Sequence, residues 1–155
     1  MPKDNMFLDA LSEFEKATQV MKEAKMATLT QVARLVRDEA KQSTPVISGD
    51  LRRNYYATPA VIVSGEKIRA EAYNAFEMSS YEELGHRQKK RWVPGRWQGN
   101  KFIYDPNSKG GMMLTERWVP GSFRLTTIAD KYRKLIPQIY EKQFETLKRK
   151  YGVKS

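Results

Sequence analysis

The residues best suited to acid–base chemistry lie close together at Glu82, Glu83 and His86, and His86 is the only histidine in the chain. Such groups move protons in catalysis only when they converge on one substrate. On an extended strand the neighbours Glu82 and Glu83 would point to opposite faces, so they would not converge. The serines also lack a nearby His–Asp pair that could activate a nucleophile. We interpret this group as a solvated edge with a turn or surface histidine, and we predict that the protein is not an enzyme.

Metal and nucleotide sites need residue types or spacings that this sequence lacks. There is no cysteine, and the carboxylates do not recur at a spacing typical of metal ligands. The glycines at positions 85, 95, 99, 110 and 111 do not form a glycine-rich loop between a strand and a helix. The lack of cysteine also excludes a disulfide framework. We therefore expect no catalytic residue, no metal and no cofactor.

The strongest chemical signal is a basic and aromatic segment between His86 and Lys101, which contains no acidic residue. It combines two tryptophans with six basic residues, namely Arg87, Lys89, Lys90, Arg91, Arg96 and Lys101 beside Trp92 and Trp97. These residue types anchor protein interfaces. They also bind single-stranded nucleic acid by stacking and charge, or they pack as rings covered by their own loop. We rank a subunit or partner interface first, nucleic-acid binding second and simple packing third.

The segment belongs to a longer basic, turn-rich β insertion over residues 86–124. The pentapeptide Arg-Trp-Val-Pro-Gly occurs twice, at 91–95 and 117–121, and each copy predicts a Pro-Gly turn. Residues 101–104 predict a strand, and residues 105–111 predict an exposed loop tip. The candidate interface residues in this insertion are Arg87, Arg91, Trp92, Arg96, Trp97, Phe102, Tyr104, Arg117 and Trp118.

A long helix is predicted over residues 4–43, where neither proline nor glycine occurs and apolar residues recur at helical spacing. Its length would be about 50–60 Å at 1.5 Å per residue. The apolar stripe changes phase near Ala27 and Thr28, which is where we expect any break. Because such a helix is longer than the core of a small domain, its own domain cannot cover all of it. We therefore expect one end to rest on something else.

The remaining elements complete an α+β pattern. Thr44-Pro45 should end the long helix, and Ser48-Gly49-Asp50 predicts a turn with a positive φ at Gly49. Residues 50–85 are interpreted as sheet: a β-hairpin of 51–63 with 67–73, then a short extended or turn segment at 81–85. A C-terminal helix over 126–151 would be capped by Thr126 or Thr127 and kinked or split at Pro137. We predict a single domain over 1–155, with the N- and C-terminal helices packed on a small, mostly antiparallel sheet.

The net charge and the length of the apolar runs limit the kinds of partner and location that the protein can have. The 155 residues include 28 lysines and arginines against 18 acidic residues, a net charge of +10. This balance favours a polyanionic partner: nucleic acid, an anionic membrane or an acidic protein surface. No apolar run reaches the roughly 18 residues of a membrane span. Four acidic residues stand where a signal peptide would be apolar, so we expect cytoplasmic synthesis without export by that route. They are Asp4, Asp9, Glu13 and Glu15.

The junction after the long helix resembles a known family. Residues 43–54 read Ser-Thr-Pro-Val-Ile-Ser-Gly-Asp-Leu-Arg-Arg-Asn, which is similar to the Pro-x-x-Thr/Ser-Gly-x-Leu-Arg junction of tailed-phage neck and tail-completion proteins, a group that includes minor tail protein Z-like proteins. The segment 81–85 and the late aromatic-Pro-Gly segment before the C-terminal helix are similar to the same family. The residues of the junction turn are Pro45, Ser48, Gly49, Leu51 and Arg52. The long basic insertion departs from the family pattern, so the resemblance leaves its role open.

The resemblance implies a structural virion protein of a phage, a prophage or a tail-like particle. It implies a homo-oligomeric ring, six-fold in symmetry, that joins head to tail around the DNA channel. The implied partners are further copies of the chain, head-connector proteins and tail-terminator or tail-tube proteins, with non-specific DNA contact and no membrane. The implied location is the virion neck, after assembly in the host cytoplasm. The alternative is a small basic nucleic-acid-binding regulator that uses residues 86–101.

Overall fold

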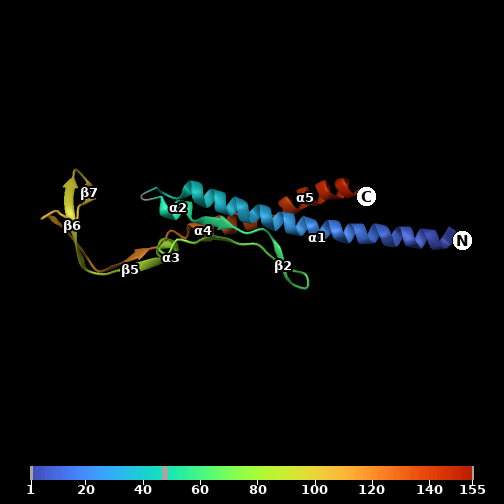
Figure 1. Cartoon of the computed structure of the whole chain (residues 1–155), viewed down its shortest axis with the longest axis horizontal. Coiled ribbons are helices and arrows are strands. Elements are labelled where there is room, and N and C mark those ends of the chain that lie inside the picture. Colours follow the sequence, from blue (N-terminus) through green and yellow to red (C-terminus); the bar gives the residue numbers. More distant parts are fainter. Residues whose placement is uncertain (1, 47–48, 155) are drawn as a thin grey trace. The chain divides into compact units, whose positions relative to one another are not determined.

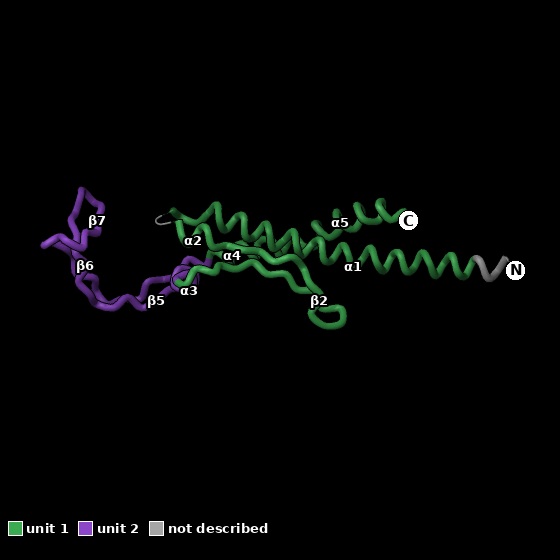
Figure 2. The backbone as a smooth tube through the Cα atoms, viewed as in Figure 1, with its two compact units in different colours: residues 1–77, 124–155 green, residues 78–123 purple. Residues whose placement is uncertain are grey.

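The chain forms two compact units in the computed structural model, which describes residues 2–46 and 49–154. Unit 1 comprises Met1–Glu77 and Arg124–Ser155, and unit 2 comprises Met78–Phe123, coloured green and purple in Figure 2. Unit 2 begins eight residues before the predicted insertion and ends one residue before its end. The single domain expected from the chain length stays a prediction.

Helix α1 (Pro2–Ser43) is the scaffold of unit 1 and is unbroken. The break expected near Ala27 and Thr28 is wrong, because Thr28 is buried within the helix and its hydroxyl donates to the Ala24 carbonyl at 2.7 Å. The apolar stripe changes phase because α1 buries two rows of residues. One row is Val20, Ala24 and Thr28, and the other is Ala33, Val36 and Ala40. The helix ends directly before Thr44-Pro45, as predicted.

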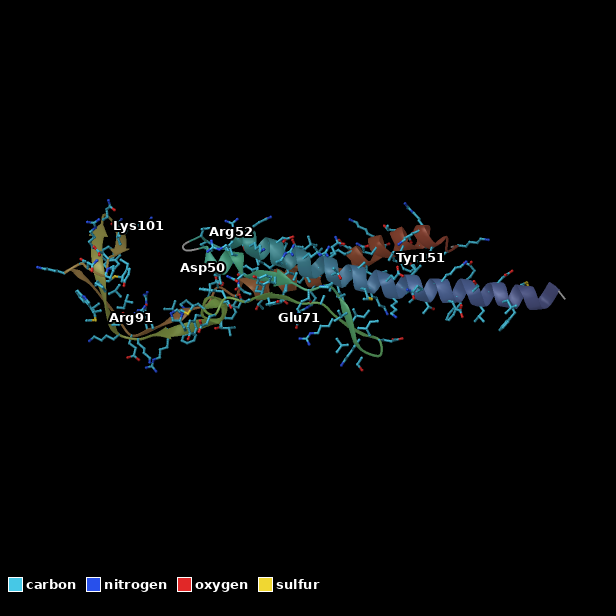
Figure 3. The ribbon with its side chains drawn as sticks, viewed as in Figure 1. Asp50, Arg52, Glu71, Arg91, Lys101 and Tyr151 are labelled. Carbon is cyan, nitrogen blue, oxygen red and sulfur yellow. The ribbon has the colours of Figure 1, made fainter. Side chains whose placement is uncertain are left out.

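The junction after α1 turns through Gly49 into the short helix α2 (Asp50–Arg53). Gly49 has φ 83°, which confirms the predicted positive φ. The strand predicted to begin at Leu51 is wrong, since Leu51 and Arg52 lie in α2 (Figure 3). The Arg53 amide donates to the Gly49 carbonyl at 3.0 Å, which closes a helical turn. Pro45 lies just after α1, and Ser48 lies outside the described residues.

Four short strands follow: β1 (Tyr55–Ala57), β2 (Val61–Ser64), β3 (Lys67–Arg69) and β4 (Ala72–Asn74). Strand β2 pairs with β3, and β1 pairs with β4, both antiparallel. The predicted β-hairpin is therefore confirmed. Its first arm begins at Tyr55 and is interrupted at 58–60, and its second arm is interrupted at 70–71. The interruption of the first arm contains Pro59, which has no N–H to donate to a ladder.

Two helices, α4 (Arg124–Arg133) and α5 (Ile136–Tyr151), replace the single C-terminal helix. Pro137 lies in the first turn of α5, where its missing N–H costs nothing, so the predicted split is confirmed. Capping by Thr126 or Thr127 is wrong, because α4 begins at Arg124. Both helices run antiparallel to α1. Their cross-links to it join Lys131 to Glu39, Gln143 to Gln31 and Tyr151 to Glu23.

The core of unit 1 lies where α1, β1 and α4 meet. Its buried members are Val36, Ala40, Tyr55 and Ile128. Val32, Ala72, Leu125, Ala129 and Tyr132 pack around them and are partly buried. Residues from an N-terminal helix, a C-terminal helix and small antiparallel sheets thus share one core, which confirms the predicted α+β class.

Unit 2 consists of one short helix and a β-ribbon. Its elements are α3 (Ser79–Leu84), β5 (Gly85–Gln88), β6 (Arg91–Gln98), β7 (Lys101–Tyr104), β8 (Gly111–Leu114) and β9 (Arg117–Pro120). The strand at 101–104 and the loop that follows it are confirmed. Of the two alternatives predicted for 81–85, extended or turn, the extended one is wrong up to Leu84, because the Tyr81 and Glu82 amides donate to the Met78 carbonyl and form a helical turn.

The two Arg-Trp-Val-Pro-Gly copies differ in what their Pro-Gly pairs do. In the first copy, Pro94 and Gly95 lie inside β6, so the turn predicted there is wrong. The Gly95 amide instead donates to the Gly110 carbonyl at 2.9 Å, which lets the strand continue to Gln98. In the second copy, β9 ends at Pro120, so Pro-Gly does end a strand there.

Candidate assembly surface

The β-ribbon of unit 2 carries all nine candidate interface residues. Arg87 lies on β5; Arg91, Trp92, Arg96 and Trp97 on β6; Phe102 and Tyr104 on β7; Arg117 and Trp118 on β9. Strand β6 pairs with β8 through its first half and with β7 through its second, while β5 pairs with β9. The antiparallel ladders place Arg87 opposite Trp118 and Trp97 opposite Phe102.

The three tryptophans of unit 2 are more than half exposed. The exposed fractions are 54% for Trp92, 60% for Trp97 and 62% for Trp118. Rings this exposed are not buried by their own loop, so simple packing does not account for them. We call these three exposed rings, which lie on β6 and β9, the aromatic surface; exposed tryptophans anchor protein contacts or stack on bases.

The two pentapeptide copies expose the same side chains. In each copy the arginine and the tryptophan are exposed and the valine is half-buried. In the first copy the Trp92 ring packs closely on Gly111 of β8, because a Cβ added to Gly111 would lie 2.7 Å from that ring. The repeat therefore presents the pair Arg-Trp to solvent twice, once on β6 and once on β9.

Trp97 is held in place by the strand opposite. Its ring meets that of Phe102 edge to face, with 5.3 Å between ring centroids and 68° between planes. Phe102 in turn lies over Gly95, where an added Cβ would be 2.6 Å from the ring. Trp97 is thus both exposed and oriented, and an oriented anchor loses less entropy on binding.

The charge of unit 2 is positive and largely exposed. Its sequence has eight lysines and arginines against four acidic residues. Arg87 forms an ion pair with Glu116, and both side chains are more than half exposed, so the pair contributes little to stability. Arg91 begins β6 and Lys101 begins β7, so positive charge is spread along the ribbon (Figure 3).

The acid–base candidates do not form a converging site. Glu82 and Glu83 lie on α3, and their backbone carbonyls accept from the amides of Ser122 and Phe123. His86 lies on β5, partly buried, with its ring centroid 5.4 Å from that of Tyr81. Of the turn or surface position expected for His86, the turn is wrong, because His86 lies within a strand. Across residues 2–46 and 49–154, no three His, Cys, Asp or Glu side chains are grouped as metal ligands would be.

The length of the long helix predicts that one end rests on something else but does not name the residues, and an exposed apolar surface lies at the start of α1. Met6, Phe7, Leu8, Leu11 and Phe14 are all exposed there. The available signal was the length of the apolar pattern, which exceeds what the later elements can cover. In the part of the chain that the structure describes, no helix is both long and apolar enough to cross a bilayer.

The family comparison covers the chain from residue 8 in α1 to residue 93 in β6. Residues 8–93 match the family described as "Bacteriophage HK97-gp10, putative tail-component". The phage-like element PBSX protein XkdI of Bacillus subtilis strain 168 is 37% identical over 93 residues, which cover 58% of this chain and 55% of XkdI. The uncharacterized protein YqbI of the same strain is 41% identical over 91 residues, 48% of this chain and 54% of YqbI. The chain spans about half the length of these curated relatives.

No solved structure matches the chain. The family match includes the junction turn and Trp92 but stops before Trp97 and Trp118, so much of the aromatic surface lies outside it. The resemblance to phage tail-completion proteins is thereby supported at the level of a phage tail component. Because the matched residues make up more than half of its length, the chain belongs to the HK97 gp10-like family of bacteriophage tail components.

Proposed function

We propose that this phage tail component forms a homo-oligomeric, six-fold ring that joins or completes the head–tail connection around the DNA channel. The observation that carries the proposal is that Trp92, Trp97 and Trp118 are all exposed on the β-ribbon of unit 2. Its neighbours would be head-connector proteins and tail-terminator or tail-tube proteins. It would act in the virion, or in a tail-like particle such as the phage-like element for which XkdI is named.

The size of the aromatic surface supports a protein contact. A buried tryptophan side chain removes about 150–250 Å² from water, and a standard interface buries about 800 Å² on each partner. Trp92, Trp97 and Trp118 could therefore supply several hundred Å² of that area. The exposed arginines around them would form the polar rim, which contributes to association rate and specificity more than to affinity.

The positive charge suits a ring near packaged DNA. Lysines and arginines contact phosphates without reading base sequence, which is what a channel for passing DNA requires. Residues 86–101 contain no carboxylate of their own, and among their basic side chains Arg87 is paired with Glu116. Nothing in this role requires catalysis, a metal or a cofactor.

Two variants of the full-length protein test the assignment side by side. Trp97→Ala should block particle assembly, because loss of a buried interface tryptophan costs about 2 kcal/mol or more. Lys89→Ala with Lys90→Ala should have a mild effect that appears mainly in the salt dependence. The measurements are particle yield by electron microscopy, with class averages for ring symmetry, and DNA retention on a gel. Normal assembly of the Trp97 variant, with loss of nucleic-acid binding in the lysine variant, would instead support a nucleic-acid-binding regulator.

A further inference from the structure

The first third of α1 carries an apolar ridge that unit 1 leaves uncovered. The ridge consists of Phe7, Leu11 and Phe14, whose exposed fractions are 69%, 44% and 70%. Their spacing of i, i+4 and i+7 places all three on one face of the helix. Figure 1 shows the N-terminal part of α1 extending past the end of α5. Three large apolar side chains on one exposed face are typical of a helix that docks into a groove.

The same unit holds an apolar groove further along α1. Two adjoining hollows of about 310 and 410 Å³ lie between α1, the β2–β3 hairpin and α5, and they share Lys25, Glu66 and Ile68. The other apolar side chains that line the hollows are Met21, Leu29, Ile62, Ile136, Pro137 and Tyr140. Each hollow falls at the lower end of the range for sites that bind small ligands or side chains.

The ridge of one chain cannot fill the groove of the same chain. Both belong to the unbroken helix α1, and Phe7 precedes Met21 by 14 residues, or about 21 Å of helix. A continuous helix cannot fold back onto its own side. The ridge can therefore enter such a groove only on another molecule.

Charge favours a second copy as that occupant. The helical segment that carries the ridge, residues 6–17, has three carboxylates against one lysine: Asp9, Glu13 and Glu15, with Lys16 paired to Glu13 at 3.1 Å. The groove is lined by Lys22 and Lys25 against a single carboxylate, Glu66, among the lining residues of the two hollows. A helical segment of net negative charge and a groove of net positive charge attract one another between copies, and opposite potentials steer association.

We propose that the ridge of one copy docks into the groove of the next, head to tail, an inference that rests on the proposed ring. A contact between two different surfaces is heterologous, and it closes into a ring when the rotation permits. This contact is separate from the tryptophan surface of unit 2.

The test uses full-length variants whose changes lie on exposed side chains. The ridge variant is Leu11→Asp with Phe14→Asp, and the groove variant is Met21→Asp with Ile62→Asp. Each alone should self-associate about 30-fold or more weakly than the parent, since each removes two apolar anchors. Mixed together, they should form a 1:1 dimer that grows no further, because one intact ridge then meets one intact groove. The measurement is sedimentation velocity, and the matched control is Val63→Asp, an exposed change on the same hairpin.

The outcomes separate this inference from the proposed function. If the parent assembles and both variants assemble equally well, the ridge–groove contact is wrong and self-assembly stands. If each variant is monomeric but the mixture stays monomeric too, the head-to-tail pairing is wrong. If the parent itself remains monomeric at the highest concentration reached, both this contact and the self-assembling ring are overturned.

Discussion

The Tyr151 hydroxyl donates to the carboxylate of Glu23 across 128 positions of sequence, 2.7 Å from Oε1 and 2.9 Å from Oε2. Hydrogen bonds from Gln19 and Tyr151 hold the pKa of Glu23 below its ordinary value, and the Glu23 carboxylate raises the pKa of Tyr151. This contact ties the last residue of α5 to α1. The apolar ridge of Phe7, Leu11 and Phe14 lies nearer the N-terminus than this contact, beyond the buried Val20.

Replacement of Glu39 should make stability depend less on pH in acid. Lys131 and Tyr132 donate to the Glu39 carboxylate and hold its pKa below the ordinary 4.5. A lowered folded pKa contributes stability that is complete above about pH 4.5 and is lost as pH falls through the folded value. We expect Glu39→Gln to melt below the parent at pH 7, with the difference shrinking below pH 4.5 in thermal melts. Tyr132→Phe should show a smaller change in the same window, and a constant difference down to pH 2 would contradict the assignment.

Truncation of Ile128 should destabilise unit 1 more than truncation of an exposed residue. Ile128 is 6% exposed and joins α4 to the core residues Val36 and Tyr55. An Ile→Ala change at a buried site costs about 2–5 kcal/mol. Chemical denaturation of Ile128→Ala should show this loss. The control Val61→Ala, on an exposed strand, should lose less than about 1 kcal/mol, and equal losses would contradict the assigned core.

A β-branched residue at Gly49 should strain the junction after α1. Gly49 has φ 83°, a conformation that a β-branched side chain adopts only at a cost of about 1 kcal/mol or more. The space itself is not limiting, because the nearest atom to an added Cβ is the flexible end of Arg53. We expect Gly49→Val to lower the melting temperature and Gly49→Asn to lower it less, since asparagine tolerates this conformation. Identical melting of Gly49→Val and the parent would show that the turn is assigned wrongly.

A methyl group at Gly95 should disturb the contact between Trp97 and Phe102, whereas one at Gly99 should leave that contact in place. A Cβ at Gly95 would lie 2.3 Å from the Ile103 carbonyl oxygen, whereas a Cβ at Gly99 would meet nothing within 4 Å. Gly95→Ala should therefore separate β6 from β7 and move Trp97 away from Phe102. Near-ultraviolet circular dichroism should show a loss of tryptophan signal in Gly95→Ala and little change in Gly99→Ala. An unchanged spectrum in Gly95→Ala would contradict the packing of Phe102 over Gly95.

The aromatic surface was predictable only in part. The residue types of Trp92, Trp97 and Trp118 and the repeated pentapeptide were visible in the sequence, since charge and aromatic content are local properties. Which rings are exposed was not visible, because exposure depends on the partner strand. Trp97 and Phe102 face one another through the register of β6 with β7, and that register depends on the unpredicted passage of β6 through Pro94 and Gly95.

By itself the sequence determined the features that depend on neighbouring residues. Helical spacing and the absence of proline determined α1, Pro45 its end, and Pro137 the division of the C-terminal helix. The tertiary structure alone decided that α1 passes unbroken through Thr28, since that residue is buried between elements far apart in sequence. It also decided that Tyr151 meets Glu23 and that Phe7 to Phe14 remain uncovered. Periodicity marks an apolar face, but only the packing of distant segments determines which part of that face is covered.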